Sequence, residues 1–304
     1  MICEIKTLRR VLSAAVRRRP YDGLLFSGGL DTAVIAALNP KVAAVTVSLG
    51  NDAEDIYYSG LVAKKFGFKH IRCKVEVDEA IDAVPEVIRI LHSFDPAIPN
   101  DLVVYFGLKK AKELGVAVIA TGDASDELFG GYSFMQEIDD LDGYIRRIAK
   151  TMVYSSNDIG RFLGLKIVQP FADKEVVDFA LSLPGEMKIR KESDRIWGKW
   201  IVRKSFEEIL SKEVAWQSKR PLESGSGMTR LRAIISEKIS DDEFIGHSYP
   251  IHFINKEHLY YYKIYREVFG DIPKPAAGVV GCPGCHGAIG RGSFHCKICG
   301  YVLN

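Results

Sequence analysis

A short glycine loop between two apolar runs constrains this chain more than any other feature. Residues 24–26 are apolar, residues 27–32 read Ser-Gly-Gly-Leu-Asp-Thr, and residues 33–38 are rich in alanine. This order predicts a strand, a tight turn and the start of a helix. Such a turn directs backbone N–H groups and the helix dipole at an anion, and glycine lets a phosphate approach without a Cβ clash. We therefore expect an anion site with Asp31 as an oxygen ligand for Mg²⁺; the alternative is a glycine turn without a ligand.

The first half of the chain alternates predicted strands and helices. Such alternation predicts the α/β class, with a twisted parallel sheet and helices on both of its faces. Ligands of these sheets bind beyond the carboxyl ends of the strands, where the glycine loop falls. The predicted strands are residues 23–26, 42–49, 70–75 and 116–120, and the predicted helices are residues 5–18, 30–38, 53–66, 78–92 and 101–114.

The second half of the chain is predicted to be mainly helical. Residues 271–281 contain two prolines and two glycines, which predicts a linker. The expected organisation is one domain over 1–270, with an α/β core at 1–133 and a helical part at 134–270, followed by this linker and a small unit at 282–304. Helical spacing occurs near residues 137–152, 174–183, 194–210, 229–239 and 256–268.

Bulk properties exclude several classes of protein. The composition, 47% hydrophobic and 26% charged over 304 residues, is ordinary for a globular protein. A net charge of +2 is too small to indicate a nucleic-acid partner by itself. No apolar run approaches the ~20 residues of a membrane helix, and the N-terminus lacks the apolar core of a signal peptide. The expected location is cytoplasmic, without a membrane partner.

A second motif places acidic side chains after another predicted strand. Residues 120–132 read Ala-Thr-Gly-Asp-Ala-Ser-Asp-Glu-Leu-Phe-Gly-Gly-Tyr, so Asp123, Asp126 and Glu127 fall within five positions. Carboxylates crowded beside a phosphate site are reasonable where Mg²⁺ offsets their repulsion. The alternative is a solvated loop that caps a helix. Because both motifs follow predicted strand ends, we expect them to face one crevice.

Together the two motifs resemble the synthetase domain of the asparagine synthetases and the related β-lactam synthetases, which are PP-loop ATP pyrophosphatases. That family carries Ser-Gly-Gly-Leu-Asp-Ser and then Gly-Glu-Gly-Ser-Asp-Glu-Leu/Val-Phe-Gly-Gly-Tyr. Three later segments are similar to family segments in the same order. They are residues 168–173 (Val-Gln-Pro-Phe-Ala-Asp against Arg-Val-Pro-Phe-Leu-Asp), 198–203 (Gly-Lys-Trp-Ile-Val-Arg against Glu-Lys-x-x-Leu-Arg), and 214–219 with 224–227 (Val-Ala-Trp-Gln-Ser-Lys and Ser-Gly-Ser-Gly against Ala-Trp-Arg-Gln-Lys and Asp-Gly-Val-Gly).

The resemblance implies roles for the matched residues. Asp31 and Asp126 are expected to coordinate Mg²⁺, and Lys219 to neutralise charge on the α-phosphate and the leaving pyrophosphate. Asp123 is expected to be catalytic, beside the reacting carbon. The other nucleotide contacts are expected from Ser27, Gly28, Gly29, Asp31 and Thr32 at the pyrophosphate, from the backbone around Val47 and Leu49 with Gly122 at the adenosine, and from Lys199.

Several positions depart from the family pattern, and four of them bear on the expected chemistry. Asp123 stands where the family has glutamate, which shortens the reach of the carboxylate by one methylene. Val168 and Gln217 replace arginines, and Ala172 replaces leucine. Because two cations are lost near the site, the sequence supports the use of ATP better than it supports a particular acid.

The resemblance implies an ATP-dependent ligase that adenylates a carboxylate, expected to be aspartate, and releases pyrophosphate. Transfer of the acyl group to ammonia would then give asparagine. The family's glutaminase domain has no counterpart before the loop at residue 27, so ammonia is expected either free or from a partner protein. The alternative is a PP-loop enzyme that modifies tRNA with sulfur or an amine and binds RNA through its C-terminal unit. A nucleotide sensor without catalysis is a third class, which the presence of Asp31, Asp126 and Lys219 disfavours.

Four cysteines near the C-terminus predict a metal site. Cys282 and Cys285 form one Cys-x-x-Cys pair, and Cys296 and Cys299 form a second pair ten residues further on. Four thiolates at this spacing are typical of a tetrahedral Zn²⁺ ribbon, with iron as the minor alternative. A closed site of this kind leaves no open position for catalysis. We therefore expect a structural role, or a surface for a partner such as RNA.

Overall fold

The structure is built around one five-stranded parallel sheet. The computed structural model describes residues 1–192, 194–290 and 292–303. Every pairing in this sheet is parallel, and the strand order is β3-β2-β1-β4-β5. The strands are β1 (Gly23–Leu25), β2 (Ala43–Leu49), β3 (Lys69–Val75), β4 (Val118–Ala120) and β5 (Lys166–Val168).

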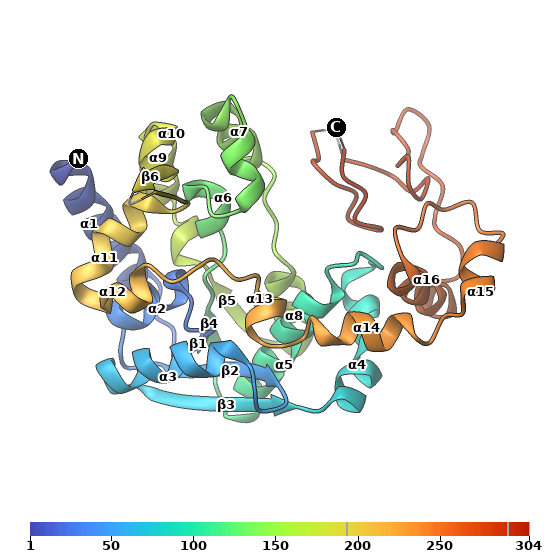
Figure 1. Cartoon of the computed structure of the whole chain (residues 1–304), viewed down its shortest axis with the longest axis horizontal. Coiled ribbons are helices and arrows are strands. Elements are labelled where there is room, and N and C mark those ends of the chain that lie inside the picture. The colour runs from blue at the N-terminus through green and yellow to red at the C-terminus, as the bar shows by residue number, and fades with distance from the viewer. Residues whose placement is uncertain (193, 291, 304) are drawn as a thin grey trace.

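Helices lie on both faces of this sheet, which confirms the predicted fold class (Figure 1). The N-terminal helix and the C-terminal segment lie at opposite ends of the long axis of the molecule. None of the described helices is long and apolar enough to cross a membrane. The helices are α1 (Ile2–Arg18), α2 (Leu30–Leu38), α3 (Glu54–Phe66), α4 (Val77–Leu91), α5 (Ile98–Glu113), α6 (Ser125–Phe129), α7 (Leu141–Ile148), α8 (Ser155–Leu163), α9 (Lys174–Ser182), α10 (Gly185–Lys188), α11 (Trp200–Leu210), α12 (Lys212–Ala215), α13 (Leu222–Gly225), α14 (Arg230–Ser236), α15 (Asp241–Gly246) and α16 (Lys256–Phe269), with 3₁₀ turns at Ser133–Glu137 and Pro170–Ala172.

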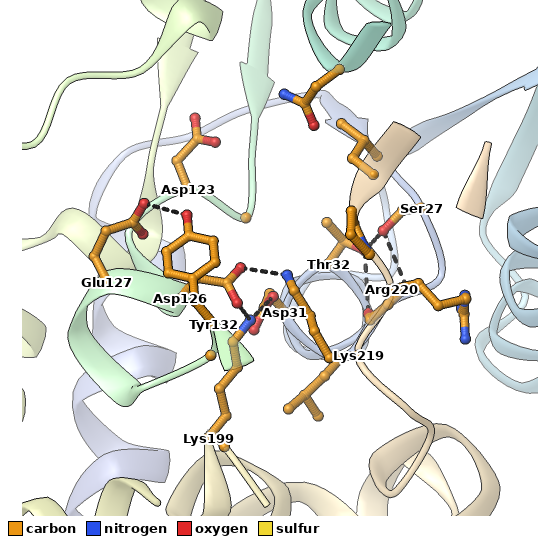
Figure 2. A pocket seen from close by; sticks show the side chains of 18 of the residues that line it. Ser27, Asp31, Thr32, Asp123, Asp126, Glu127, Tyr132, Lys199, Lys219 and Arg220 are labelled. Carbon is orange, nitrogen blue, oxygen red and sulfur yellow. Dashed lines mark hydrogen bonds and ion pairs between the residues drawn. The ribbon is translucent and has the colours of Figure 1, made fainter. Parts of the chain in front are cut away.

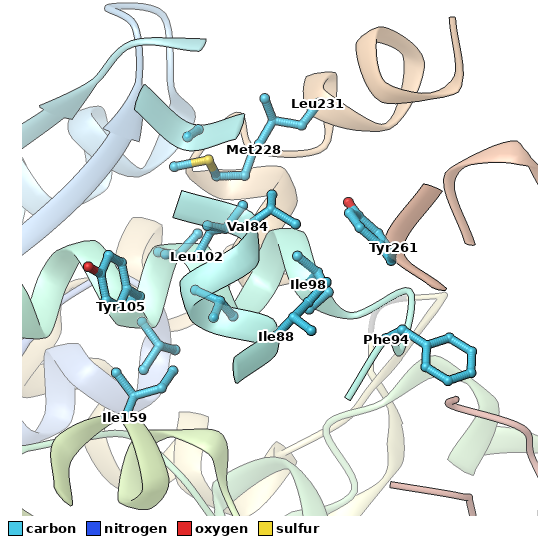
Figure 3. Close-up of a cluster of buried hydrophobic side chains, with 14 of the residues drawn as sticks. Val84, Ile88, Phe94, Ile98, Leu102, Tyr105, Ile159, Met228, Leu231 and Tyr261 are labelled. Carbon is cyan, nitrogen blue, oxygen red and sulfur yellow. The ribbon is translucent and has the colours of Figure 1, made fainter. Parts of the chain in front are cut away.

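Side chains on the two faces of β2 pack into two separate hydrophobic cores. Val45, Val47 and Leu49 enter a core built with α4, α5, α8, α14 and α16. Ala44 enters a second core built with α1, α2, α9 and α11. In the first core, Val84 of α4 and Leu231 of α14 belong to one apolar cluster (Figure 3). This two-sided burial is what a period of two residues along a central strand produces, and it fixes the sheet between its helical layers.

Two parts of the predicted helical half differ from expectation. Residues 166–168 form β5, which pairs with β4 and completes the sheet; a strand this short shows no alternation in the sequence. The predicted helix at 194–210 is wrong in its first part, because the antiparallel strands β6 (Arg190–Glu192) and β7 (Arg195–Trp197) precede α11. Lys199 has a left-handed φ of +54, and a Cβ at Gly198 would clash with the backbone, so helix starts only at Trp200.

The C-terminal segment packs on the helical body. The Phe94 N–H donates to the Ile298 carbonyl at 2.8 Å, and the His252 N–H donates to the Gly284 carbonyl at 2.9 Å. The four cysteines of the two Cys-x-x-Cys motifs belong to the first core. Residues 271–281, predicted as a linker, contain no helix or strand apart from a bridge between Gly281 and Ala288.

Candidate active site

A cleft of about 630 Å³ opens at the carboxyl ends of β1 and β4. Ser27 follows β1 and Thr121 follows β4, so both sequence motifs border this one cleft. Residues 195–199 and 217–222 line its other sides. Figure 2 shows Lys199 and Lys219 pointing toward the acidic loop from these segments.

The glycine loop packs tightly against α3 and is hydrogen-bonded to Gln217. Gly28 has a φ of +73, and a Cβ there would lie 2.7 Å from the Cα of Ser59 in α3. The Gln217 side-chain N–H donates to the Gly28 carbonyl at 3.0 Å, and the Gly29 N–H donates to Ser27 Oγ at 3.2 Å. Because α2 begins directly after this turn, its N-terminal dipole favours an anion in the cleft.

Gly28→Ala is expected to lose more stability than Gly67→Ala. Both glycines have nearly the same φ, +73 and +71, so both alanines carry the left-handed strain of about 1–2 kcal/mol. Only Gly28 lacks room for the methyl group, since a Cβ at Gly67 meets nothing within 4 Å. Urea unfolding of the two variants measures the difference. Equal losses would contradict the close packing of α3 on the loop.

Two lysines and two aspartates form the charged centre of the cleft. Lys199 Nζ lies 2.6 Å from Asp31 Oδ2 and 2.8 Å from Asp126 Oδ1. Lys219 Nζ lies 2.9 Å from Asp126 Oδ2, and Ser125 Oγ donates to Asp31 Oδ1 at 2.6 Å. Lys199 is 3% exposed, whereas Lys219 is 38% exposed. Lys199 therefore ties the two carboxylates together, and Lys219 is the cation that a ligand can reach.

The buried pair of Asp126 and Lys199 keeps its charges. Burial opposes ionisation of Asp126, but the Lys199 and Lys219 ammonium groups outweigh it and lower the pKa of Asp126. Burial also opposes the charge on Lys199, yet Asp126 and Asp31 raise the pKa of this lysine. Both shifts favour the charged forms of Asp126 and Lys199 inside the cleft.

Arg203 of α11 connects the two segments that carry these lysines. Its guanidinium donates to the Gly198 carbonyl at 2.9 Å and to the Ala215 and Gln217 carbonyls at 2.7 and 2.9 Å. It also lies over the Trp197 ring at 4.9 Å. Arg203 is buried, and burial lowers its pKa to about 10. One arginine therefore fixes the spacing between the Lys199 and Lys219 segments.

Asp123 lies on the far side of the cleft from Ser27 (Figure 2). Its Oδ2 atom accepts from Thr121 Oγ1 at 2.6 Å, from Ser156 Oγ at 2.6 Å and from Gln169 Nε2 at 2.9 Å. Thr121 and Ser156 are buried. Asp123 is therefore fixed by side chains that follow β4, begin α8 and follow β5.

Arg220, next to Lys219, is held by acidic residues of α3. Its guanidinium lies 3.6 Å from Asp55 Oδ1 and 3.4 Å from Glu54 Oε1, and it covers the Tyr58 ring at 4.3 Å. It also donates to Gln217 Oε1 at 2.7 Å. Gln217, where the resemblance has arginine, thus links Arg220 to the glycine loop through the Gly28 carbonyl.

Asp55 is expected to make stability fall as the pH rises. Burial raises the pKa of Asp55 from 3.8 to about 7, against the opposing effect of Arg220. The folded chain therefore keeps a proton that the unfolded chain loses, so stability decreases between about pH 4 and pH 7, by about 1.4 kcal/mol per pH unit at most. The unfolding free energy of Asp55→Asn should fall less steeply than that of the wild type from pH 5 to pH 8. Parallel curves would contradict this assignment.

The structure brings most of the predicted site residues together. Gly28 is not among the residues that line the cleft. The side chain of Leu49 is 1% exposed and belongs to the core, and its backbone carbonyl accepts a hydrogen bond from Arg230. The sequence reasoning missed Ser125, Ser156, Gln169, Arg203 and Arg220; Ser125, Gln169 and Arg203 stand inside quoted motifs, whereas Ser156 carries no signal. Lining residues predicted from the sequence are Ser27, Gly29, Asp31, Thr32, Val47, Gly122, Asp123, Asp126, Lys199 and Lys219.

The four paired cysteines come together as one cluster. Their sulfur atoms all lie within 4.8 Å of one another, with Cys282–Cys299 at 3.6 Å and Cys285–Cys296 at 3.8 Å. With Zn–S bonds of ~2.3 Å, the edge of a tetrahedron is ~3.8 Å, whereas a disulfide is ~2.05 Å. The Gly284 N–H donates to Cys282 Sγ at 3.3 Å, which supports a thiolate. The cluster could hold a metal ion with four sulfur ligands.

Fold and site together define an α/β protein with a glycine loop and a carboxylate–lysine centre at the strand ends. The chain belongs to the asparagine synthase family, whose sequence model matches residues 7–169 and 144–274.

Named relatives agree with this family. The chain is 25% identical to asparagine synthetase [glutamine-hydrolyzing] 1 of Arabidopsis thaliana, with 90% of this chain and 54% of the relative aligned. It is 26% identical to asparagine synthetase B [glutamine-hydrolyzing] of Escherichia coli (strain K12), with 89% of this chain and 54% of the relative aligned. The chain thus spans about half the length of these relatives.

Two solved structures share a weaker likeness. One is the U34-tRNA thiolase NcsA from Methanococcus maripaludis with its [4Fe-4S] cluster, at 12% identity and a TM-score of 0.32, with 94% of this chain and 84% of that chain covered. The other is a predicted subunit of a tRNA methyltransferase from Methanocaldococcus jannaschii, at 15% identity and a TM-score of 0.28, with 61% and 86% covered. Scores this low carry no argument about function.

Proposed function

We propose that this chain is an ATP-dependent amide ligase that adenylates a carboxylic acid and passes the acyl group to ammonia. Aspartate is the expected acid and asparagine the product, with AMP and pyrophosphate released. The observation that carries this proposal is the pairing of Lys199 and Lys219 with the two oxygens of Asp126, beside the glycine loop. Membership of the asparagine synthase family supports the same chemistry.

The glycine loop and the two lysines suit the first step. Loop N–H groups and the α2 dipole would hold the pyrophosphate end of ATP. Lys219, the exposed cation, would neutralise charge that develops when the α-phosphorus is attacked and pyrophosphate leaves. Lys199 would keep Asp31 and Asp126 in place while these charges change.

Asp31 and Asp126 fit a Mg²⁺ site by the chemistry of their donors. Mg²⁺ is usually bound through one or two carboxylates together with substrate phosphates. Here two carboxylates already share one ammonium group at 2.6 and 2.8 Å, so the pair can hold a cation. When bound with ATP, Mg²⁺ would offset the charge of the phosphates.

The second step needs a group that accepts a proton from the attacking nitrogen. Asp123 is a carboxylate that lines the cleft on the side away from the glycine loop. We assign it this role. Ammonia is the nitrogen donor in this proposal, and the cysteine cluster would hold structural Zn²⁺.

Exchange of labelled pyrophosphate into ATP tests the proposal. The assay is run with each amino acid, with acids that lack the amino group, and with tRNA. Exchange that requires aspartate or another acid supports the proposal, and formation of the amide with ammonia completes it. Exchange that requires tRNA would replace it with the tRNA-modifying alternative, and ATP binding without exchange would leave a nucleotide sensor.

A further inference from the structure

Asp123 is held through one oxygen only. Three donors converge on Oδ2, and they come from segments that are far apart in the sequence. A carboxylate oxygen has about two lone-pair sites, so Oδ2 has no capacity left for a further proton. Among the described residues, no hydrogen bond to Oδ1 is recorded. Oδ1 is therefore the oxygen that can act on a ligand in the cleft.

The two side chains in this contact are both departures from the family pattern. Asp123 stands where the resemblance has glutamate, and Gln169 stands where it has valine. Aspartate is shorter by one carbon–carbon bond, ~1.5 Å. Valine cannot donate a hydrogen bond, whereas Gln169 donates to Asp123 at 2.9 Å and also to Ser156 at 3.3 Å. Asp123, the shorter acid, and Gln169, the additional hydrogen-bond donor, are therefore in direct contact.

We propose that Gln169 is a positioning residue that fixes the orientation of the shorter Asp123 carboxylate. This inference rests on the proposed function. In the transfer step, the nitrogen of ammonia forms a bond to the acyl carbon, the bond between that carbon and the AMP oxygen breaks, and AMP leaves. One proton of the attacking nitrogen passes to Asp123 Oδ1. Ser156 and Thr121 complete the support of Oδ2 and leave Oδ1 free.

The test compares Asp123→Glu, Gln169→Val and the double variant. Gln169→Val should slow amide formation from preformed acyl-adenylate by ~10–100-fold, because a positioned base contributes on the order of 10²–10⁴-fold. Pyrophosphate exchange, which precedes this step, should change much less. Asp123→Glu should also slow the transfer step alone. The double variant, which restores the family pair, should transfer faster than either single variant.

A matched control adds the same methylene to an aspartate on α8, away from the cleft. Asp158→Glu lies on the exposed surface of α8, where its carboxylate pairs with Arg161. Combined with Gln169→Val, Asp158→Glu should not restore the rate of amide formation. Losses that simply multiply in the Asp123→Glu/Gln169→Val variant would overturn the proposal.

Failure of the proposed function is recognised separately. If the wild type catalyses neither exchange nor amide formation, the proposed function fails. Crystal structures of the wild type and Gln169→Val then decide the positioning claim by themselves. A carboxylate of Asp123 that turns away in the variant supports it, and an unmoved carboxylate contradicts it.

Discussion

Lys199→Met is expected to abolish pyrophosphate exchange and to destabilise the fold. The Lys199 ammonium group is 3% exposed and lies within 2.8 Å of both Asp31 and Asp126. Removing it leaves two partly buried carboxylates close together without their shared cation, and breaking such a buried pair costs about 3–5 kcal/mol. Loss of a positioned charge in the site should lower the exchange rate by ~10²–10³-fold or more. Chemical unfolding in the presence of a chelator and the exchange assay measure the two effects.

Mg²⁺ and a surface lysine provide the controls for this result. Because Mg²⁺ would supply positive charge to Asp31 and Asp126, it should stabilise Lys199→Met more than it stabilises the wild type. Lys174→Met removes a lysine that is 84% exposed and pairs only with Asp178, so both stability and exchange should stay near wild type. A Lys199→Met variant with wild-type stability in chelator would contradict the charged centre described here.

Cys285→Ser is expected to release the metal and to loosen the cysteine cluster and α16. Residues 282–303 have little apolar core of their own, and the metal supplies on the order of 10–16 kcal/mol in small zinc peptides. The cysteines also belong to the same core as Phe94 and Tyr265, so loss of the cluster exposes part of α16. Metal analysis should fall to background, and hydrogen exchange should accelerate in both the cluster and α16.

Cys3→Ser is the matched control, because Cys3 is exposed and belongs to α1, which lies at the other end of the molecule (Figure 1). It should keep the metal content and the exchange protection of the wild type. Unchanged protection of α16 in Cys285→Ser would contradict the shared core. If that variant lost its metal and still catalysed pyrophosphate exchange, the cluster would serve folding or a partner rather than the cleft.

The sequence predicted the sheet because its strands and helices carry clear signals. The apolar run at residues 42–49 and the glycine loop at 27–32 specify β2 and the turn after β1 by local chemistry alone. β5 was missed because three residues cannot show a period, and its partner β4 lies far away in the sequence. The hairpin before α11 was missed because it depends on Gly198 packing against the backbone at Gly130, which is a tertiary contact.

Some residues of the candidate site could likewise be predicted from the sequence, and others could not. Asp31, Asp126 and Lys219 stand in contiguous motifs, so their types and spacing were visible in the sequence. No local pattern marks Ser156, and Arg203, although it ends a quoted motif, acts through contacts that only the fold brings near. The side chain of Leu49 belongs to the core, so the expected contact with adenosine could come only from its backbone and stays a prediction.

Transfer of oxygen from the acid to AMP tests the central claim most directly. The acid that supports exchange is prepared with ¹⁸O in its carboxylate and incubated with ATP, Mg²⁺ and ammonia. If the carboxylate attacks the α-phosphorus in this cleft, the AMP phosphate will contain one ¹⁸O atom for each amide formed, and pyrophosphate will contain none. Unlabelled AMP, or formation of ADP with label in inorganic phosphate, would contradict activation of the acid by adenylation.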